Sequence, residues 1–129
     1  MSDQELLSYI LFAETKDMHD AIAIANVIKN RAMNPKRYGE GIQGVITKPK
    51  QFSGLNSPEF KKAQSGKLTS EEQEIMKGMN AIARSVIIGA VGDSTEGATY
   101  YFNPKLVKPK WSENMTKQMS TDYHEYYKE

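Results

Sequence analysis

Glu14 is a carboxylic acid on the apolar face of a predicted helix. Leu7, Ile10 and Leu11 recur at three- and four-residue spacing, and Glu14 is the next position on that face. Burial of an acid there removes water from it, which favours its protonated form. A carboxyl group that stays protonated near neutral pH is what a general acid needs. The pattern alone slightly favours the other interpretation, a helix that ends at Glu14 with the headgroup turned to solvent.

Residue types that suit a sugar ligand follow much later in the chain. Tyr100 and Tyr101 lie in an aromatic run that ends at Asn103. Rings stack on the CH faces of sugars, and an amide pairs with their hydroxyl groups. Consecutive side chains of a strand point to opposite faces, so at least one ring points away from the core. This favours a binding role for one tyrosine, against the alternative of a purely structural strand.

A second polar group, Gln51-Phe52-Ser53, lies in a loop flanked by proline and glycine. Gln51 and Ser53 are suited to contact a ligand, while Phe52 would anchor the loop in the core. Most such triplets are only loop anchors.

The sequence favours chemistry without a metal or cofactor. It has no cysteine, which excludes disulfides, thiol catalysis and cysteine-bound zinc. Its two histidines, His19 and His124, are too few for a recognisable metal site. A set of Glu14 and His19 with Asp17 or Asp20 is conceivable, but such residues are routine at helix ends. No nucleophile-elbow motif indicates serine catalysis, and we expect no cofactor and no metal.

Length and charge indicate one globular domain over residues 1–129, which we expect to be a monomer. The apolar share of 39% is enough for a folded core. Seventeen basic and sixteen acidic residues leave a net charge of +1, which selects neither nucleic acid nor membrane as partner. No stretch has the apolar length of a membrane span. The first five residues lack the basic start of a secretory signal.

Periodicity and capping residues predict a mainly α fold. A helix over residues 2–14 has a capping box, Ser2 with Glu5, and Asp17 or Asp20 would cap a second helix that reaches about residue 33. The second helix is apolar nearly all round, as in the centre of a small domain.

Further helices are expected within and after the least regular third of the chain, residues 34–69. Ser57-Pro58 would begin a short helix, and a capping box of Ser70 with Gln73 would begin a longer one that stops near Gly89. Residues 97–103 predict a small extended or β element. One single compact helical domain with this small element is the expected fold.

A helix-turn-helix binding module is the alternative from another functional class. Residues 2–33 would supply its two helices. The second of these is too apolar for a recognition face and carries only Lys29 and Arg31 near its end. The sequence disfavours this module.

Four short motifs, in order along nearly the whole chain, resemble the bacterial cell-wall hydrolase family typified by spore cortex-lytic enzymes and also found as phage endolysins. They are Phe12-Ala13-Glu14 before Ile28-Lys29-Asn30-Arg31, then Gly44-Val45-Ile46-Thr47-Lys48-Pro49-Lys50-Gln51-Phe52-Ser53, Gly97-Ala98-Thr99-Tyr100-Tyr101-Phe102-Asn103-Pro104 and His124-Glu125-Tyr126-Tyr127. Each is short, but the ordered set is fairly specific.

The resemblance implies a lysozyme-like (α+β), mostly helical catalytic domain that cleaves peptidoglycan between N-acetylmuramic acid and N-acetylglucosamine. Glu14 matches the catalytic acid of the family. In a lytic transglycosylase it would protonate the glycosidic oxygen and then act as base while the muramoyl 6-hydroxyl closes an anhydro ring. A water-using hydrolase of the same bond, assisted by Asp17, Asp20 or Glu40, is the close alternative.

Eight further positions match the motifs and are candidates for lining the substrate cleft. They are Gln51, Phe52, Ser53, Tyr100, Tyr101, Asn103, His124 and Tyr127. The resemblance leaves open which of them contact sugar and which maintain the motif.

One segment departs from the family pattern. Residues 15–20 lack an Ala-Arg-Gly-Glu sequence and are fewer than in the family, so only Asp17 or Asp20 can replace a second acid often found there.

We expect glycan strands of peptidoglycan as the partner. Without a signal or a wall-binding domain, a phage endolysin made in the host cytoplasm and released to the wall is favoured over a secreted spore enzyme.

Overall fold

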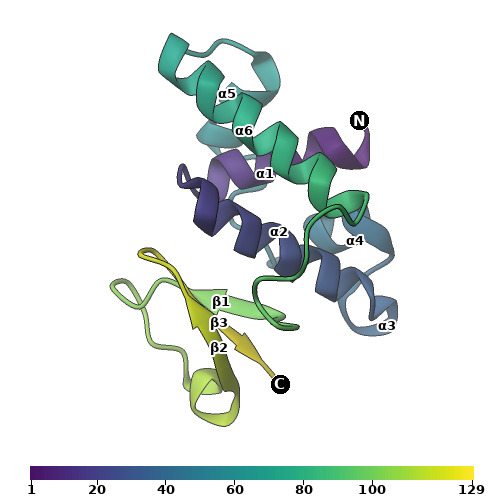
Figure 1. Cartoon of the computed structure of the whole chain (residues 1–129), viewed down its shortest axis with the longest axis vertical. Coiled ribbons are helices and arrows are strands. Elements are labelled where there is room, and N and C mark those ends of the chain that lie inside the picture. Colours follow the sequence, from purple (N-terminus) through teal and green to yellow (C-terminus); the bar gives the residue numbers. More distant parts are fainter.

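Six helices form the larger part of the molecule, and a three-stranded sheet lies at one end of them (Figure 1). The computed structural model describes all residues from 1 to 129. The helices are α1 (Asp3–Glu14), α2 (Met18–Ala32), α3 (Pro35–Tyr38), α4 (Gly41–Thr47), α5 (Pro58–Ser65) and α6 (Ser70–Ile87). The strands are β1 (Tyr100–Phe102), β2 (Thr116–Ser120) and β3 (Glu125–Lys128), and a 3₁₀ helix spans Lys110–Asn114. None of the helices combines the length and apolar character of a membrane span.

The first two helices begin as their capping residues predict. The Ser2 hydroxyl accepts a hydrogen bond from the Glu5 amide at 3.1 Å, and the Glu5 carboxylate accepts one from the Ser2 amide at 3.0 Å. Of the two caps considered for α2, Asp17 is the one used, since its carboxylate accepts a hydrogen bond from the Asp20 amide at 2.8 Å. Only residues 15–17 separate the helices, so the end of α1 lies beside the start of α2.

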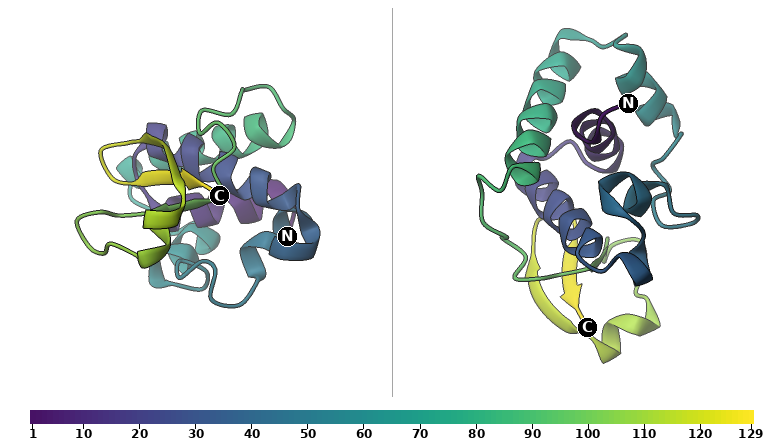
Figure 2. Two further views of the ribbon diagram at one scale, coloured as in Figure 1. Left: turned by 90° about the horizontal axis from the view of Figure 1, so that it is seen from below. Right: turned by 90° about the vertical axis from the view of Figure 1, so that its right-hand side faces the viewer.

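α2 forms the centre of the helical part. Its Ala23, Ile24, Val27 and Ile28 are fully buried, and it packs against α1, α4 and α6. The right-hand view of Figure 2 looks along α1, with α6 on one side and α5 on the other. Burial of each of the three larger side chains, Ile24, Val27 and Ile28, contributes about 1.5–3 kcal/mol, so packing rather than helix propensity stabilises this arrangement.

The predicted start of α6 was wrong by one residue. Thr69, not Ser70, is the cap: its hydroxyl accepts from the Glu72 amide at 3.1 Å and its amide donates to the Glu72 carboxylate at 3.0 Å. Both pairs have capping-box spacing, but Glu72 also forms an ion pair with Lys62 of α5, which Gln73 cannot make. The predicted stop is confirmed, because Gly89 has a φ of +74° just after the helix.

The sheet is antiparallel and has the order β1-β3-β2, so β3 lies in the middle. Tyr101 of β1 lies opposite Tyr126 of β3, and Tyr100 lies opposite Tyr127. Tyr101 and Tyr126 stack on one face, with 5.5 Å between ring centroids. The predicted element near residues 97–103 corresponds to β1, whereas β2 and β3 were not predicted.

Candidate active site

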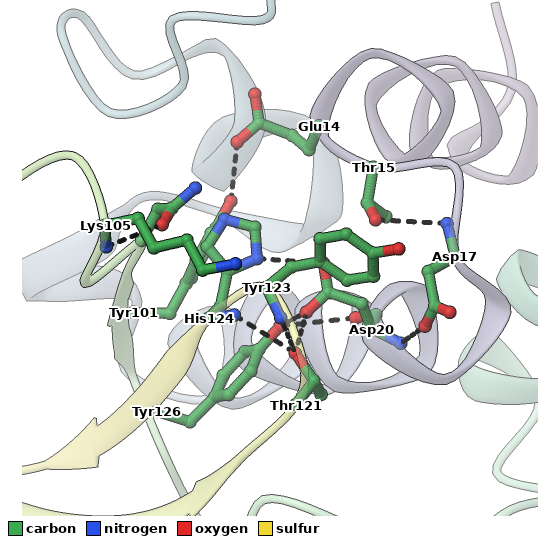
Figure 3. Close-up of polar contacts among 11 residues, drawn as sticks. Glu14, Thr15, Asp17, Asp20, Tyr101, Lys105, Thr121, Tyr123, His124 and Tyr126 are labelled. Carbon is green, nitrogen blue, oxygen red and sulfur yellow. Dashed lines mark hydrogen bonds and ion pairs between the residues drawn. The ribbon is translucent and has the colours of Figure 1, made fainter.

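Glu14 is the last residue of α1, and its carboxylate lies in a cleft of about 590 Å³ (Figure 3). Its Oε1 accepts a hydrogen bond of 2.7 Å from the hydroxyl of Tyr101. The helix therefore ends where one sequence interpretation placed the end, but the headgroup is fixed at the cleft instead of turning freely to solvent. The cleft is lined by Ala13, Glu14, Thr15, Lys16, Asp17, Ser53, Asn103, Leu106, Tyr123 and His124.

The loop after Ser53 comes unusually close to Glu14. Gly54 is buried, and a Cβ atom at this position would overlap Oε2 of Glu14 and lie 3.1 Å from the Cβ of Ala13. A side chain at residue 54 would thus displace the carboxylate. The loop that carries Ser53 and the end of α1 form adjoining walls of the cleft because residue 54 is glycine.

Tyr101 is fixed from two directions. Its ring stacks on Tyr126 and meets the ring of His124 edge-on at 5.1 Å. Burial, and then the nearby Glu14 carboxylate, raise the pKa of Tyr101 well above its ordinary value. Its hydroxyl therefore keeps its proton and donates a hydrogen bond to Glu14.

Asp20 lies behind the cleft and is fully buried. Its Oδ1 accepts hydrogen bonds from the hydroxyls of Thr121 at 2.7 Å and Tyr126 at 2.6 Å, and its Oδ2 lies 2.8 Å from Nδ1 of His124. Burial opposes ionisation of Asp20, but the hydrogen bonds from His124, Thr121 and Tyr126 outweigh it and lower its pKa. Burial and the bond to Asp20 raise the pKa of Tyr126.

Arg31, at the end of α2, organises a second group of predicted residues. Its Nη1 donates to Oε1 of Gln51 at 3.1 Å, and its Nε donates to the Thr99 carbonyl at 2.7 Å. The guanidinium lies 5.5 Å from the ring centroid of Phe52 and 5.3 Å from that of Tyr100. Arg31 belongs to one of the four motifs, but no role in the site was predicted for it. The signal available was an arginine near the end of a helix that is apolar over most of its length.

The structure thus divides the predicted site residues into three groups. Ser53, Asn103 and His124 line the cleft with Glu14, and Tyr101 contacts Glu14 directly. Gln51, Phe52 and Tyr100 surround Arg31 beside the cleft. Tyr127 stacks on Phe102 at 5.4 Å and packs edge-on against Trp111, on the other face of the sheet.

Sequence reasoning missed two large side chains at the cleft. Tyr123 and Leu106 line it, with exposed fractions of 50% and 77%. Nothing in the local pattern distinguishes them, because their place depends on how two separate loops meet. Of the three acids considered as helpers of a water-using enzyme, Asp17 lines the cleft, Asp20 is enclosed in its own hydrogen bonds, and Glu40 is exposed elsewhere.

Comparison with known proteins identifies the family and the fold of the chain. A family model described as cell wall hydrolase matches residues 16–127, a region that begins just after Glu14. No curated protein matches the sequence significantly.

Two solved structures have the same fold. One is the catalytic domain of the germination-specific lytic transglycosylase SleB from Bacillus anthracis, with 23% identity, a TM-score of 0.70, and coverage of 98% of this chain and 93% of that one. The other is the catalytic domain of the SleB protein of Bacillus cereus, with 24% identity, a TM-score of 0.71, and coverage of 98% and 89%. The mainly helical, lysozyme-like fold class is confirmed. Since its family model spans most of the sequence, the chain belongs to the cell wall hydrolase family.

Proposed function

We propose that this protein degrades peptidoglycan as a lytic transglycosylase that cleaves the bond between N-acetylmuramic acid and N-acetylglucosamine. The observation that carries the proposal is the Glu14 carboxylate, fixed at the cleft by the hydroxyl of Tyr101. Membership of the cell wall hydrolase family supports the substrate. The SleB domain of the same fold, described as a lytic transglycosylase, supports the reaction.

The surroundings of Glu14 indicate which of its oxygens carries the proton. A tyrosine hydroxyl donates to an unprotonated oxygen, and Oε1 accepts the hydroxyl of Tyr101. The acidic proton therefore belongs on Oε2, beside the backbone of Gly54. In the proposed reaction Oε2 protonates the glycosidic oxygen as its bond to the anomeric carbon breaks. The oxygen of the muramoyl 6-hydroxyl then bonds to that carbon, and Glu14 recovers a proton from this hydroxyl.

Replacement of the acid tests the proposal. Glu14→Gln keeps the shape of the side chain but removes the transferable proton, so we expect near-complete loss of activity with an unchanged fold. Turbidity loss of purified peptidoglycan measures activity, and circular dichroism measures folding. Glu40→Gln, which changes an exposed acid away from the cleft, is the matched control. A folded Glu14→Gln protein with full activity contradicts the proposal.

A water-using hydrolase is the second candidate, because Asp17 also lines the cleft. Mass spectrometry of the muropeptides separates the two reactions: transglycosylase products end in an anhydro ring and are lighter by one water. Asp17→Asn keeps a side chain able to cap α2 and removes the charge. In a transglycosylase this variant should retain most activity, whereas a hydrolase that relies on Asp17 should lose it.

A further inference from the structure

The buried carboxylate of Asp20 joins the start of α2 to β3 and the segment before it. Its side-chain donors are Thr121, His124 and Tyr126, and all three come from residues 121–126. The proposed reaction does not use Asp20, since the side chain has no exposed surface. A fully buried acid that is satisfied by three donors has a defined orientation.

The hydrogen bonds of Asp20 determine which nitrogen of His124 carries a proton. An ionised carboxylate can only accept hydrogen bonds, so Nδ1, at 2.8 Å from Oδ2, must be the donor. In the neutral imidazole the other nitrogen, Nε2, is then unprotonated and is an acceptor. His124 makes no other side-chain hydrogen bond, and it leaves no buried polar atom unpaired.

Nε2 of His124 is available to a ligand in the cleft. The side chain lines the same cleft as Glu14 and is 14% exposed. Figure 3 shows one ring nitrogen turned to Asp20 and the other turned away from it. The edge-on contact with Tyr101, whose hydroxyl donates to Glu14, places His124 on the wall next to the acid.

We propose that Asp20 is a positioning residue that fixes His124 as a hydrogen-bond acceptor for an N–H or O–H donor of the sugar in the cleft. This inference rests on the proposed function, because it takes a glycan as the ligand. Peptidoglycan sugars offer two donors of this kind, an acetamido N–H and ring hydroxyls. An acetamido N–H can only donate, so an unprotonated nitrogen is its matching partner.

Two substitutions of His124 separate its two nitrogens. The amide of Asn lies where Nδ1 lies, so His124→Asn retains the bond to Asp20 but removes the acceptor in the cleft. The amide of Gln reaches the place of Nε2, so His124→Gln retains a polar group in the cleft but loses the bond to Asp20. We expect His124→Asn to fold with unchanged thermal stability and to lose on the order of tenfold in kcat/KM, as for one hydrogen bond to substrate. His124→Gln should retain more activity and less stability.

The role of Asp20 is tested by the protonation of His124 itself. Nitrogen-15 NMR of the imidazole in mild alkali should show the proton on Nδ1 in the natural protein. Asp20→Asn allows an amide N–H to donate to Nδ1, so the proton should move to Nε2 and activity should fall as in His124→Asn. Tyr126→Phe is the control, because it removes another donor to the same carboxylate and keeps the ring stacked on Tyr101. It should leave the proton on Nδ1 of His124, because the contact between Nδ1 and Oδ2 of Asp20 is retained.

The outcomes are distinct from those of the proposed function. A proton on Nε2 in the natural protein, or His124→Asn with full activity, overturns the inference whatever the reaction is. Failure of the natural protein to release muropeptides overturns the proposed function, while the NMR result still decides whether Asp20 sets the tautomer. A comparison of the natural glycan with an analogue that is N-methylated at the acetamido nitrogen identifies the donor, because the methyl group replaces the N–H. The analogue should slow the natural protein but not His124→Asn if the N–H is the partner, and should affect both equally if the partner is a hydroxyl.

Discussion

The two oxygens of Glu14 have different surroundings, and the difference arises from two residues far apart in the sequence. Tyr101 donates a hydrogen bond to Oε1, and the absence of a side chain at Gly54 leaves room for Oε2. Neither contact is visible in the local pattern around Glu14, which indicated only that an acid lies on an apolar face. The orientation of the acid is therefore a tertiary property.

Removal of the Tyr101 hydroxyl should impair catalysis without unfolding the protein. In Tyr101→Phe the ring still stacks on Tyr126, but Oε1 of Glu14 loses its donor and the carboxyl group can rotate. We expect kcat to fall by about tenfold, corresponding to one lost hydrogen bond, as measured by release of soluble muropeptides.

Tyr100→Phe is the matched control for this change. It removes the Tyr100 hydroxyl, which accepts a hydrogen bond from Arg37 at 3.0 Å. Tyr100 is the neighbour of Tyr101 in β1, and its side chain lies on the opposite face of the sheet. Its activity should stay near that of the natural protein. Equal activities of the two variants would show that the hydroxyl of Tyr101 does not orient the acid.

At the scale of elements, helices and strands were predictable to different degrees. The starts of α1 and α2 follow from Ser2, Glu5 and Asp17, because capping residues act within one turn of their own position. β2 and β3 were not predicted, because Thr116–Ser120 is mostly polar and the sheet pairs residues 100–102 with residues 125–127. Pairing over such a separation is decided by tertiary contacts. The same limit applies to the site, where His124 and Asp20 are brought together by that pairing.

The close contact between Gly54, in the loop after Ser53, and Glu14, at the end of α1, can be tested by substitution. Gly54→Ala should displace the Glu14 carboxylate, because the added methyl group overlaps Oε2. A shift of about 1 Å in a catalytic group costs on the order of a hundredfold in rate, so we expect a loss of that size in kcat. The backbone at Gly54 has no positive φ, and the effect is therefore steric.

Gly92→Ala is the control for this substitution. A Cβ atom at Gly92 meets no atom within 4 Å, and its φ is not in the left-handed region. Activity and melting temperature should both stay unchanged. If Gly54→Ala is as active as Gly92→Ala, the loop does not define the position of the acid.

At the scale of the whole molecule, Asp20 and Asp93 connect segments outside the helices to α2 through hydrogen bonds. Asp20 binds residues 121–126, and Asp93 binds Asn30 of α2 through a hydrogen bond of 2.8 Å. Burial opposes ionisation of Asp93, but hydrogen bonds from Thr95, Asn30 and Gly97 outweigh it, so its pKa lies below the usual 3.8, as does that of Asp20. Both acids therefore stabilise the folded state in their ionised form.

These two acids predict the pH dependence of stability. A carboxyl group whose pKa is lower in the folded than in the unfolded chain contributes fully above the unfolded value, and its contribution is lost as pH falls through the folded value. Melting temperature, followed by circular dichroism, should therefore decrease as the pH falls below the ordinary aspartate pKa of 3.8. Asp93→Asn should melt at a lower temperature at neutral pH and lose less on acidification. Parallel curves for the two proteins would exclude a contribution from Asp93.

The central position of β3 has a consequence for how the protein is made. β1 and β2 each pair with β3 and not with one another, although both leave the ribosome before it. A nascent chain that has not reached residue 124 lacks Tyr126 behind Tyr101 and lacks His124, even though all six helices have already been synthesised. Since helices form from local contacts and strand pairing over long separations is slow, the cleft is completed late. During synthesis the protein is a folded helical body without an oriented acid, and it gains a working cleft only when its final strand inserts.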